Sequence, residues 1–262
     1  MRILLAVVAV FIGLLHSACQ RQHLPEVHVF AAASLSVAFA DLSAAFEVAN
    51  PGIRVVANFA GSQVLRVQIE EGASADVFVS ANEVHMGRLG VKGFLLDPVR
   101  FATRNDLVLA VPAGNPANVR TLGDLAAANR RVVMAGEAVP AGAYARETLA
   151  RFASVSGKAD IDDVILDRVI SFETNVRLVA TKLELGEADA GFVYRTDVRA
   201  SDGRLAVVEL PENIQVSARY PIAILREAKR ADLAELFVSF VRSDTGQTIL
   251  DRNGFGSGTA VD

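Results

Sequence analysis

The sequence predicts an α/β protein of two lobes, each a mixed, mainly parallel sheet flanked by helices. Apolar segments of strand length alternate with segments of helical periodicity along nearly the whole chain. The alternation is interrupted by a polar stretch at residues 103–105 and then starts again. A chain of 262 residues, 52% of them hydrophobic, can bury two cores without disulfides or a structural metal.

The N-terminal segment is predicted to be an export signal. Residues 3–15 are apolar and follow Arg2, but at about 1.5 Å per residue they reach only about 20 Å, short of the bilayer core of about 30 Å. We therefore assign residues 1–18 to a signal peptide. Cys19, the only cysteine, stands where bacterial lipoproteins are cleaved and lipidated, although ordinary cleavage beside an incidental cysteine is the alternative. Either way, no internal disulfide can form.

The first lobe is assigned to residues 26–105 and 226–262, and it begins with β–turn–α units. The strands expected in it are residues 27–30, 53–59 and 76–80. Helices are expected to follow them near Ser34, Ser62 and Asn82, and the second of these should bury Val64, Leu65, Val67 and Ile69. The C-terminal helix carrying Leu233, Leu236, Phe237 and Phe240 is expected to pack back on this lobe.

The second lobe is assigned to residues 106–225. Its expected strands are residues 107–111, 131–135, 169–172 and 190–194, and residues 220–225 are expected to pair beside 107–111. Thr121 is the predicted cap of a helix over residues 122–128, Pro140 opens a second helix and Asn175 caps a third. The chain would then pass between the lobes twice, and these two crossings would form a hinge.

Several functional classes are disfavoured. A net charge of −4 and the absence of any basic run longer than Arg130–Arg131 give no footprint for nucleic acid or an anionic membrane. No pair of histidines or of His and Glu has metal-ligand spacing, so no metal site is predicted. No nucleophile elbow, phosphate loop or dinucleotide fingerprint occurs, so nothing in the sequence demands catalysis.

A set of helix starts could instead bind an anion. Ser34, Ser62, Ala141 and Val176 each lie where a strand gives way to a helix N-terminus, which exposes unpaired N–H groups and partial positive charge. The alternative is that both serines only cap their helices. Tyr194 ends a strand, and its alternative role is that of a half-buried ring whose hydroxyl bonds to backbone.

Six motifs resemble one family, the molybdate-binding proteins of ATP-binding-cassette importers. The match runs through nearly all of residues 27–256. The motifs occur in the order and at the spacing of that family, and they are VFAAASL at 29–35, FAGSQ at 59–63, ASADVFVSA at 73–81, VPAGAYA at 139–145, ETNVR at 173–177 and DAGFVYRTD at 189–197. Gln63 departs from the family, whose members commonly carry a smaller residue there. The resemblance implies the type II periplasmic binding protein fold, in which two lobes close on a ligand.

The resemblance also implies the ligand groups and partners. Ser34 and Ser62 would donate through hydroxyl and backbone N–H, Ala141 and Val176 through backbone N–H, and Tyr194 through its phenol. The ligand would be molybdate or tungstate, with no cofactor. The partners would be the permease and ATPase of an importer, and the protein would be a periplasmic monomer, with a lipid anchor if Cys19 is modified.

The residues alone leave other functions open. A site built only of donors suits any oxyanion that is fully deprotonated near pH 7, so sulfate or another small anion is an alternative ligand. Hydrogen phosphate would need an acceptor, and Asp76 or Glu173 could supply one if either pointed inward. A periplasmic serine hydrolase using Ser34 or Ser62 is a further alternative, although no general base is visible beside either serine.

Overall fold

A computed structural model describes residues 24–158 and 160–257. The predicted signal peptide, residues 1–18, and Cys19 lie outside these ranges. Within them, no helix is both long and apolar enough to cross a membrane.

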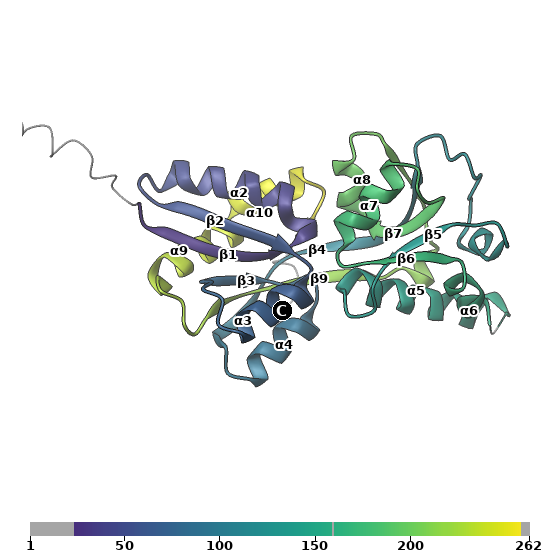
Figure 1. Cartoon of the computed structure of the whole chain (residues 1–262). Coiled ribbons are helices and arrows are strands. Elements are labelled where there is room, and N and C mark those ends of the chain that lie inside the picture. The colour runs from purple at the N-terminus through teal and green to yellow at the C-terminus, as the bar shows by residue number, and fades with distance from the viewer. Residues whose placement is uncertain (1–23, 159, 258–262) are drawn as a thin grey trace, which may run out of the picture.

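The strands form one continuous path through two bodies that lie side by side (Figure 1). The path runs β2-β1-β3-β9-β4-β7-β5-β6, and β8 and β10 pair with β4 beside it. The bounds of the strands are β1 Glu26–Ala32, β2 Arg54–Ala60, β3 Val77–Val79, β4 Leu95–Pro112, β5 Val132–Ala135, β6 Val169–Glu173, β7 Ala190–Tyr194, β8 Leu205–Val208, β9 Ser217–Leu225 and β10 Gly256–Ser257. We call the body of β1–β3 the first lobe and that of β5–β7 the second lobe.

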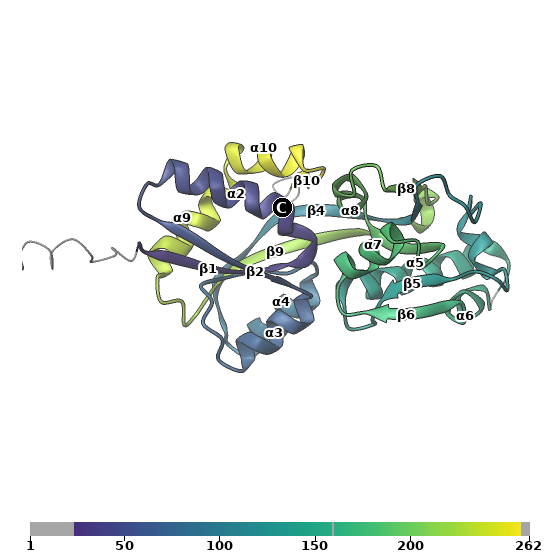
Figure 2. The ribbon, with the colours of Figure 1, turned by 45° about the horizontal axis from the view of Figure 1, so that its top comes forward.

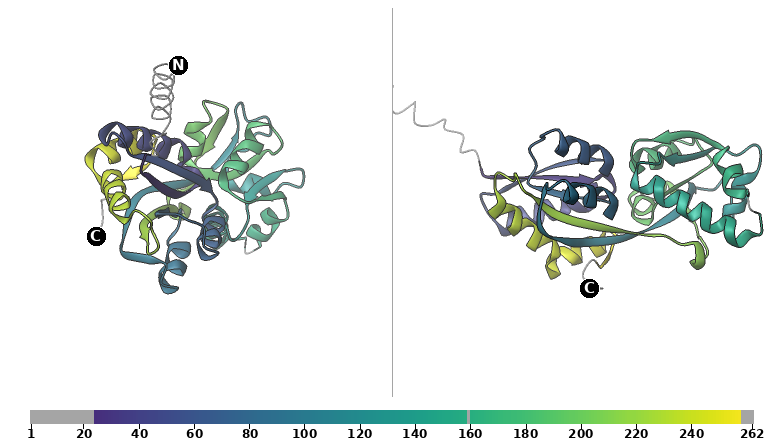
Figure 3. Two further views of the ribbon diagram at one scale, coloured as in Figure 1. Left: turned by 60° about the vertical axis from the view of Figure 1, so that its left-hand side comes forward. Right: turned by 90° about the horizontal axis from the view of Figure 1, so that it is seen from below.

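Each lobe has a parallel centre. Strand β1 pairs in parallel with β2 and β3 in the first lobe, and β5 pairs in parallel with β6 and β7 in the second. Strands β4 and β9 pair antiparallel and run between the lobes (Figure 3). The sheets are therefore mixed and mainly parallel within the lobes, as the alternation of elements predicts.

The prediction that residues 220–225 pair beside residues 107–111 was wrong. Strand β9 pairs with β4 from Leu95 to Asp106, whereas residues 107–112 of β4 pair with β7 and β8. The cause is that β4 begins at Leu95, earlier than the sequence pattern indicates. Its first part contains Pro98, Arg100 and a register shift between Leu96 and Arg100, all of which hide the strand pattern.

Helices cover both faces of each sheet. In the first lobe, α2 and α10 lie on the opposite side from α3 and α4, and in the second lobe α7 and α8 lie opposite α5 and α6 (Figures 1 and 2). The bounds of the helices are α2 Ser36–Ala49, α3 Ser62–Glu70, α4 Glu83–Val91, α5 Pro140–Ser156, α6 Ile161–Leu166, α7 Val176–Glu184, α8 Arg195–Ala200, α9 Ala231–Arg242 and α10 Asp244–Arg252. Short 3₁₀ helices cover Ala33–Leu35, Leu122–Ala126 and Glu212–Ile214.

The core of the first lobe joins chain segments that are far apart in the sequence. Phe46 of α2 contacts Phe237 and Phe240 of α9 edge to face, with ring centroids 5.2 and 5.6 Å apart. The C-terminal helices are thereby fixed on the first lobe. On α3, only Leu65 and Ile69 of the four expected residues are buried; Val64 and Val67 are 37% and 38% exposed, because they lie on the face that turns away from the sheet.

Local helix signals were predicted correctly in the second lobe. The Asn175 side chain accepts from Leu178 N at 3.2 Å and caps α7. Pro140 opens α5, where its missing N–H costs no helical hydrogen bond. Thr121 caps the segment after it, but that segment is a 3₁₀ helix ending at Ala126.

Candidate functional site

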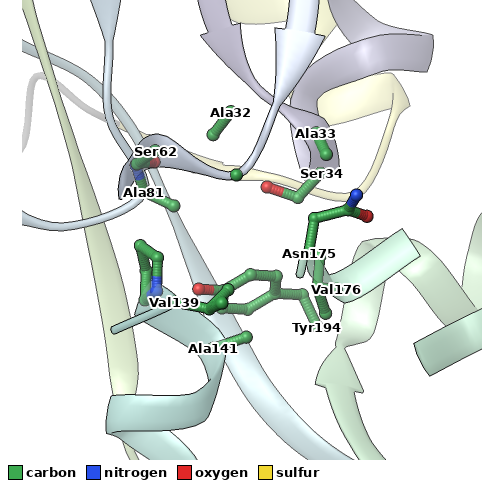
Figure 4. Close-up of a pocket in the computed structure, with 12 residues that line it drawn as sticks. Ala32, Ala33, Ser34, Ser62, Ala81, Val139, Ala141, Asn175, Val176 and Tyr194 are labelled. Carbon is green, nitrogen blue, oxygen red and sulfur yellow. The ribbon is translucent and has the colours of Figure 1, made fainter. Parts of the chain in front are cut away.

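A small pocket lies between the two lobes, where strands β1 and β7 end (Figure 4). The five residues predicted from the sequence all line it: Ser34, Ser62, Ala141, Val176 and Tyr194. The first two come from the first lobe and the other three from the second, so the pocket is formed only where the two lobes meet.

Ser34 lies in the 3₁₀ turn between β1 and α2, and its hydroxyl points toward the pocket in Figure 4. The Ser34 hydroxyl and the Tyr220 hydroxyl are 2.9 Å apart, and both residues are buried. Ser34 does not act as a helix cap, because the 3₁₀ turn Ala33–Leu35 has no side-chain cap. If Tyr220 donates to Ser34 Oγ, the hydroxyl hydrogen of Ser34 is free to donate into the pocket.

Ser62 is the first residue of α3, and Gly61 occupies the cap position. Its hydroxyl oxygen accepts from Ala81 N at 3.0 Å rather than from a helix N–H. Capping of its own helix therefore does not explain this serine. With the oxygen already accepting from Ala81, the hydroxyl hydrogen remains to be donated to a ligand.

Ala141 and Val176 each lie in the first turn of a helix that begins at the pocket. Val176 is the first residue of α7, and Ala141 is the second residue of α5. The N–H groups of a first helical turn have no partner within the helix, and the helix dipole adds partial positive charge at this end. Helices α3, α5 and α7 thus bring their N-termini to one pocket from both lobes.

Tyr194 carries the least satisfied polar group of the site. It is 1% exposed, and its hydroxyl makes no hydrogen bond of accepted geometry among the described residues, although the Tyr220 side chain lies close enough to help raise its pKa. Its predicted alternative role, a hydroxyl bonded to backbone, is therefore not what the structure contains. Burial raises the pKa of the Tyr194 hydroxyl well above its ordinary value, so the group stays protonated and can donate.

A buried carboxylate fixes the backbone of Tyr194. Asp197 Oδ2 accepts from Tyr194 N at 3.0 Å, and Asp197 Oδ1 lies 3.3 Å from the Arg177 guanidinium. Burial raises the pKa of Asp197 to about 6, against the opposing effects of Arg177 and of the Tyr194 N–H. Through its bond to the Tyr194 N–H, the Asp197 side chain holds the end of β7 to the first turn of α8.

None of the residues that line the pocket is charged. Asp76 instead accepts from His28 N at 2.8 Å, and Glu173 pairs with Lys182 Nζ at 2.8 Å. Neither carboxylate lines the pocket, so neither supplies it with an acceptor. Among the described residues, the hydroxyls of Ser34 and Ser62 bond to no histidine or carboxylate. Neither serine therefore has the general base that a hydrolase would need beside its nucleophile. These residues also contain no group of three His, Cys, Asp or Glu side chains able to hold a metal.

Two contributors were missed by the sequence reasoning. Tyr220 supports Ser34 from β9, and Ala81 both lines the pocket and holds the Ser62 hydroxyl through its N–H. No local signal marks Tyr220, which stands 186 residues from Ser34 in the chain. Ala81 ends the motif at 73–81 and could have been found as the residue just beyond a buried strand.

The lobes also touch beside the pocket. His85 Nε2 lies 2.9 Å from Ala138 O of the second lobe, so the neutral tautomer with hydrogen on Nε2 donates to that carbonyl. His85 Nδ1 is buried without a partner among the described residues. Burial holds the pKa of His85 below its ordinary value of 6.5, and Arg66 and Arg88 lower it further.

Because the pKa of His85 is lowered on folding, the free energy of unfolding should depend on pH. Because its folded pKa is depressed, the unfolded chain binds the proton first as pH falls below about 6.5, and the free energy of unfolding should decrease by up to about 1.4 kcal/mol per pH unit. His85→Gln keeps a donor for Ala138 O and removes the titration. Urea unfolding at pH 7.5, 6.5 and 5.5 should show wild type losing stability relative to His85→Gln; parallel curves would contradict the assignment. Asp197 also titrates in this range, but it does so in both proteins, so its contribution cancels in the difference between wild type and His85→Gln.

Two α/β lobes around a pocket of neutral donors define a solute-binding protein. The sequence matches the family described as bacterial extracellular solute-binding protein over residues 27–256, and the chain belongs to that family. The molybdate-binding protein ModA of Mycobacterium tuberculosis is 37% identical over 228 residues, which cover 87% of this chain and 83% of the relative. The family resemblance drawn from the six motifs is thereby confirmed.

Solved structures agree on the fold. The periplasmic molybdate-binding protein of Azotobacter vinelandii is 22% identical, with a TM-score of 0.74 over 87% of this chain and 98% of that one. The sulfate-binding protein SubI of Mycobacterium tuberculosis is 18% identical, with a TM-score of 0.82 over 90% of this chain and 88% of that one. At these identities the two structures support the type II periplasmic binding protein fold and do not distinguish between ligands.

Proposed function

We propose that this protein captures molybdate, or the chemically similar tungstate, between its lobes and delivers the anion to an importer driven by ATP. The observation that carries the proposal is the pocket itself, which combines donors from both lobes with no charged side chain. The name of the Mycobacterium tuberculosis relative supports molybdate over sulfate. Ser34, Ser62, Ala141, Val176 and Tyr194 are the proposed ligand residues.

The chemistry of the pocket favours a fully deprotonated dianion. Such an ion accepts hydrogen bonds at every oxygen, and burying it is favourable only if all of these oxygens are satisfied. Hydrogen phosphate keeps one proton, which would need an acceptor, and no carboxylate lines the pocket. Because donors come from both lobes, the ligand should bind the closed arrangement more tightly and shift the protein toward it.

The cellular setting is part of the proposal. Residues 1–18 would direct export to the periplasm, and Cys19, if lipidated, would anchor the mature protein to the membrane. The lobes would comprise residues 26–105 with 226–262, and residues 106–225. The partners would be a permease and its ATPase, the protein would act as a monomer, and it would need no cofactor.

Calorimetric titration with four oxyanions tests the ligand. Molybdate and tungstate are expected to bind with one site per chain, sulfate more weakly, and phosphate without measurable heat. In competition at matched concentrations, sulfate should not displace bound molybdate. Equal competition by sulfate would contradict the selectivity, and tight phosphate binding would contradict the donor-only account of the pocket.

A further inference from the structure

The lobes approach each other closely at Gly61, one of the residues that line the pocket. A Cβ atom added at Gly61 would lie 2.6 Å from Thr174 O of the second lobe and 2.5 Å from the side-chain amide of Gln63. Real Cβ atoms do not tolerate such distances, so only glycine allows this contact. The backbone of the first lobe, the Gln63 amide and the backbone before α7 are therefore packed together at one point.

Gln63 bridges the lobes at this point. It is the second residue of α3, and its Nε2 donates to Thr174 O at 2.7 Å. Thr174 directly precedes Asn175, which caps α7, and Asn175 is followed by Val176, which lines the pocket. A hydrogen bond to Thr174 O therefore restrains the short segment that places a ligand donor of the second lobe.

We propose that Gln63 is a positioning residue that holds the lobes closed over the bound anion and slows its release. The proposal rests on the proposed function, since it concerns the same pocket. Gln63 does not line the pocket and acts through Thr174 and the N-terminus of α7. Because the bridge joins groups of different lobes, it forms only on closure, and its loss should mainly raise the dissociation rate constant.

The variants can separate the hydrogen bond from packing. Gln63→Met keeps the length of the side chain and removes the donor, whereas Gln63→Glu places an acceptor against Thr174 O. Gln68→Met is the matched control on the same helix, because Gln68 accepts from Asn58 Nδ2 at 3.3 Å within the first lobe. The chain has no tryptophan, and all three of its tyrosines, Tyr144, Tyr194 and Tyr220, lie at or beside the pocket, so tyrosine fluorescence can report binding.

Stopped-flow displacement of molybdate measures release. Gln63→Met should raise the dissociation rate constant about 2- to 12-fold, the range expected for one net hydrogen bond, with little change in the association rate constant. Gln63→Glu should raise it further, and Gln68→Met should match wild type. Equal dissociation rate constants in wild type and Gln63→Met would overturn the proposal.

A second measurement keeps the two proposals distinguishable. If wild type binds none of the four oxyanions, the proposed function fails, and small-angle scattering of the ligand-free proteins then decides the role of Gln63. Gln63→Met should have a larger radius of gyration than wild type and Gln68→Met, because the lobes separate more often. An unchanged radius of gyration would overturn the role of Gln63 in that case.

Discussion

Replacement of Gly142 by alanine is expected to destabilise the protein by about 3 kcal/mol and to weaken anion binding. Gly142 is the third residue of α5, directly after Ala141. A Cβ there would overlap the carbonyl oxygens of Ala135 and Gly136 and would lie 2.7 Å from Gly136 C. These are backbone atoms, so no rotamer change can relieve the overlap. The first turn of α5 must shift, and the Ala141 N–H must shift with it.

Urea unfolding without ligand and calorimetric titration with molybdate would measure the two effects of Gly142→Ala. Gly87→Ala is the control, because Gly87 lies inside α4, is exposed, and has nothing within 4 Å of an added Cβ. That change should stabilise the protein by up to about 1 kcal/mol, since alanine is the better helix former. A Gly142→Ala protein as stable as wild type would contradict the packing described between β5 and α5.

Local chemistry explains which parts of the fold could be predicted from the sequence. Asn175 and Pro140 act on groups within a few residues of themselves, so their roles as helix starts could be predicted before the structure. The start of strand β4 could not be predicted from such local signals. Its first part pairs with β9, more than a hundred residues later in the chain, and Pro98 and Arg100 interrupt its apolar pattern.

The same distinction applies to the site. The positions of Ser34 and Ser62 at strand ends predict where these residues lie, because the carboxyl ends of parallel strands meet at one edge of a sheet. What each hydroxyl bonds to depends on Tyr220 and on Ala81, which the sequence does not place. The contact of Gln63 with Thr174 likewise depends on how the lobes meet. The only feature of the sequence that marks Gln63 is its departure from the smaller residue common in the family.

Replacement of Tyr194 by phenylalanine should change stability and binding in opposite directions. The Tyr194 hydroxyl is buried and unpartnered among the described residues, so its removal should leave the free energy of unfolding of the ligand-free protein unchanged or higher. If the same hydroxyl donates to a dianion, its loss removes a charge-assisted hydrogen bond of about 1.5–3 kcal/mol. The dissociation constant for molybdate should then rise about 10- to 150-fold.

The control for Tyr194→Phe is Tyr144→Phe. The Tyr144 hydroxyl donates to Ala81 O at 3.4 Å, beside the pocket but not among the residues that line it, so its removal should change the dissociation constant far less. Because molybdate stabilises only the folded protein, Tyr194→Phe should also lose part of the ligand-induced rise in Tm. A Tyr194→Phe protein that binds molybdate as wild type does would remove Tyr194 from the ligand set, and one that is clearly less stable without ligand would mean that its hydroxyl has a structural partner.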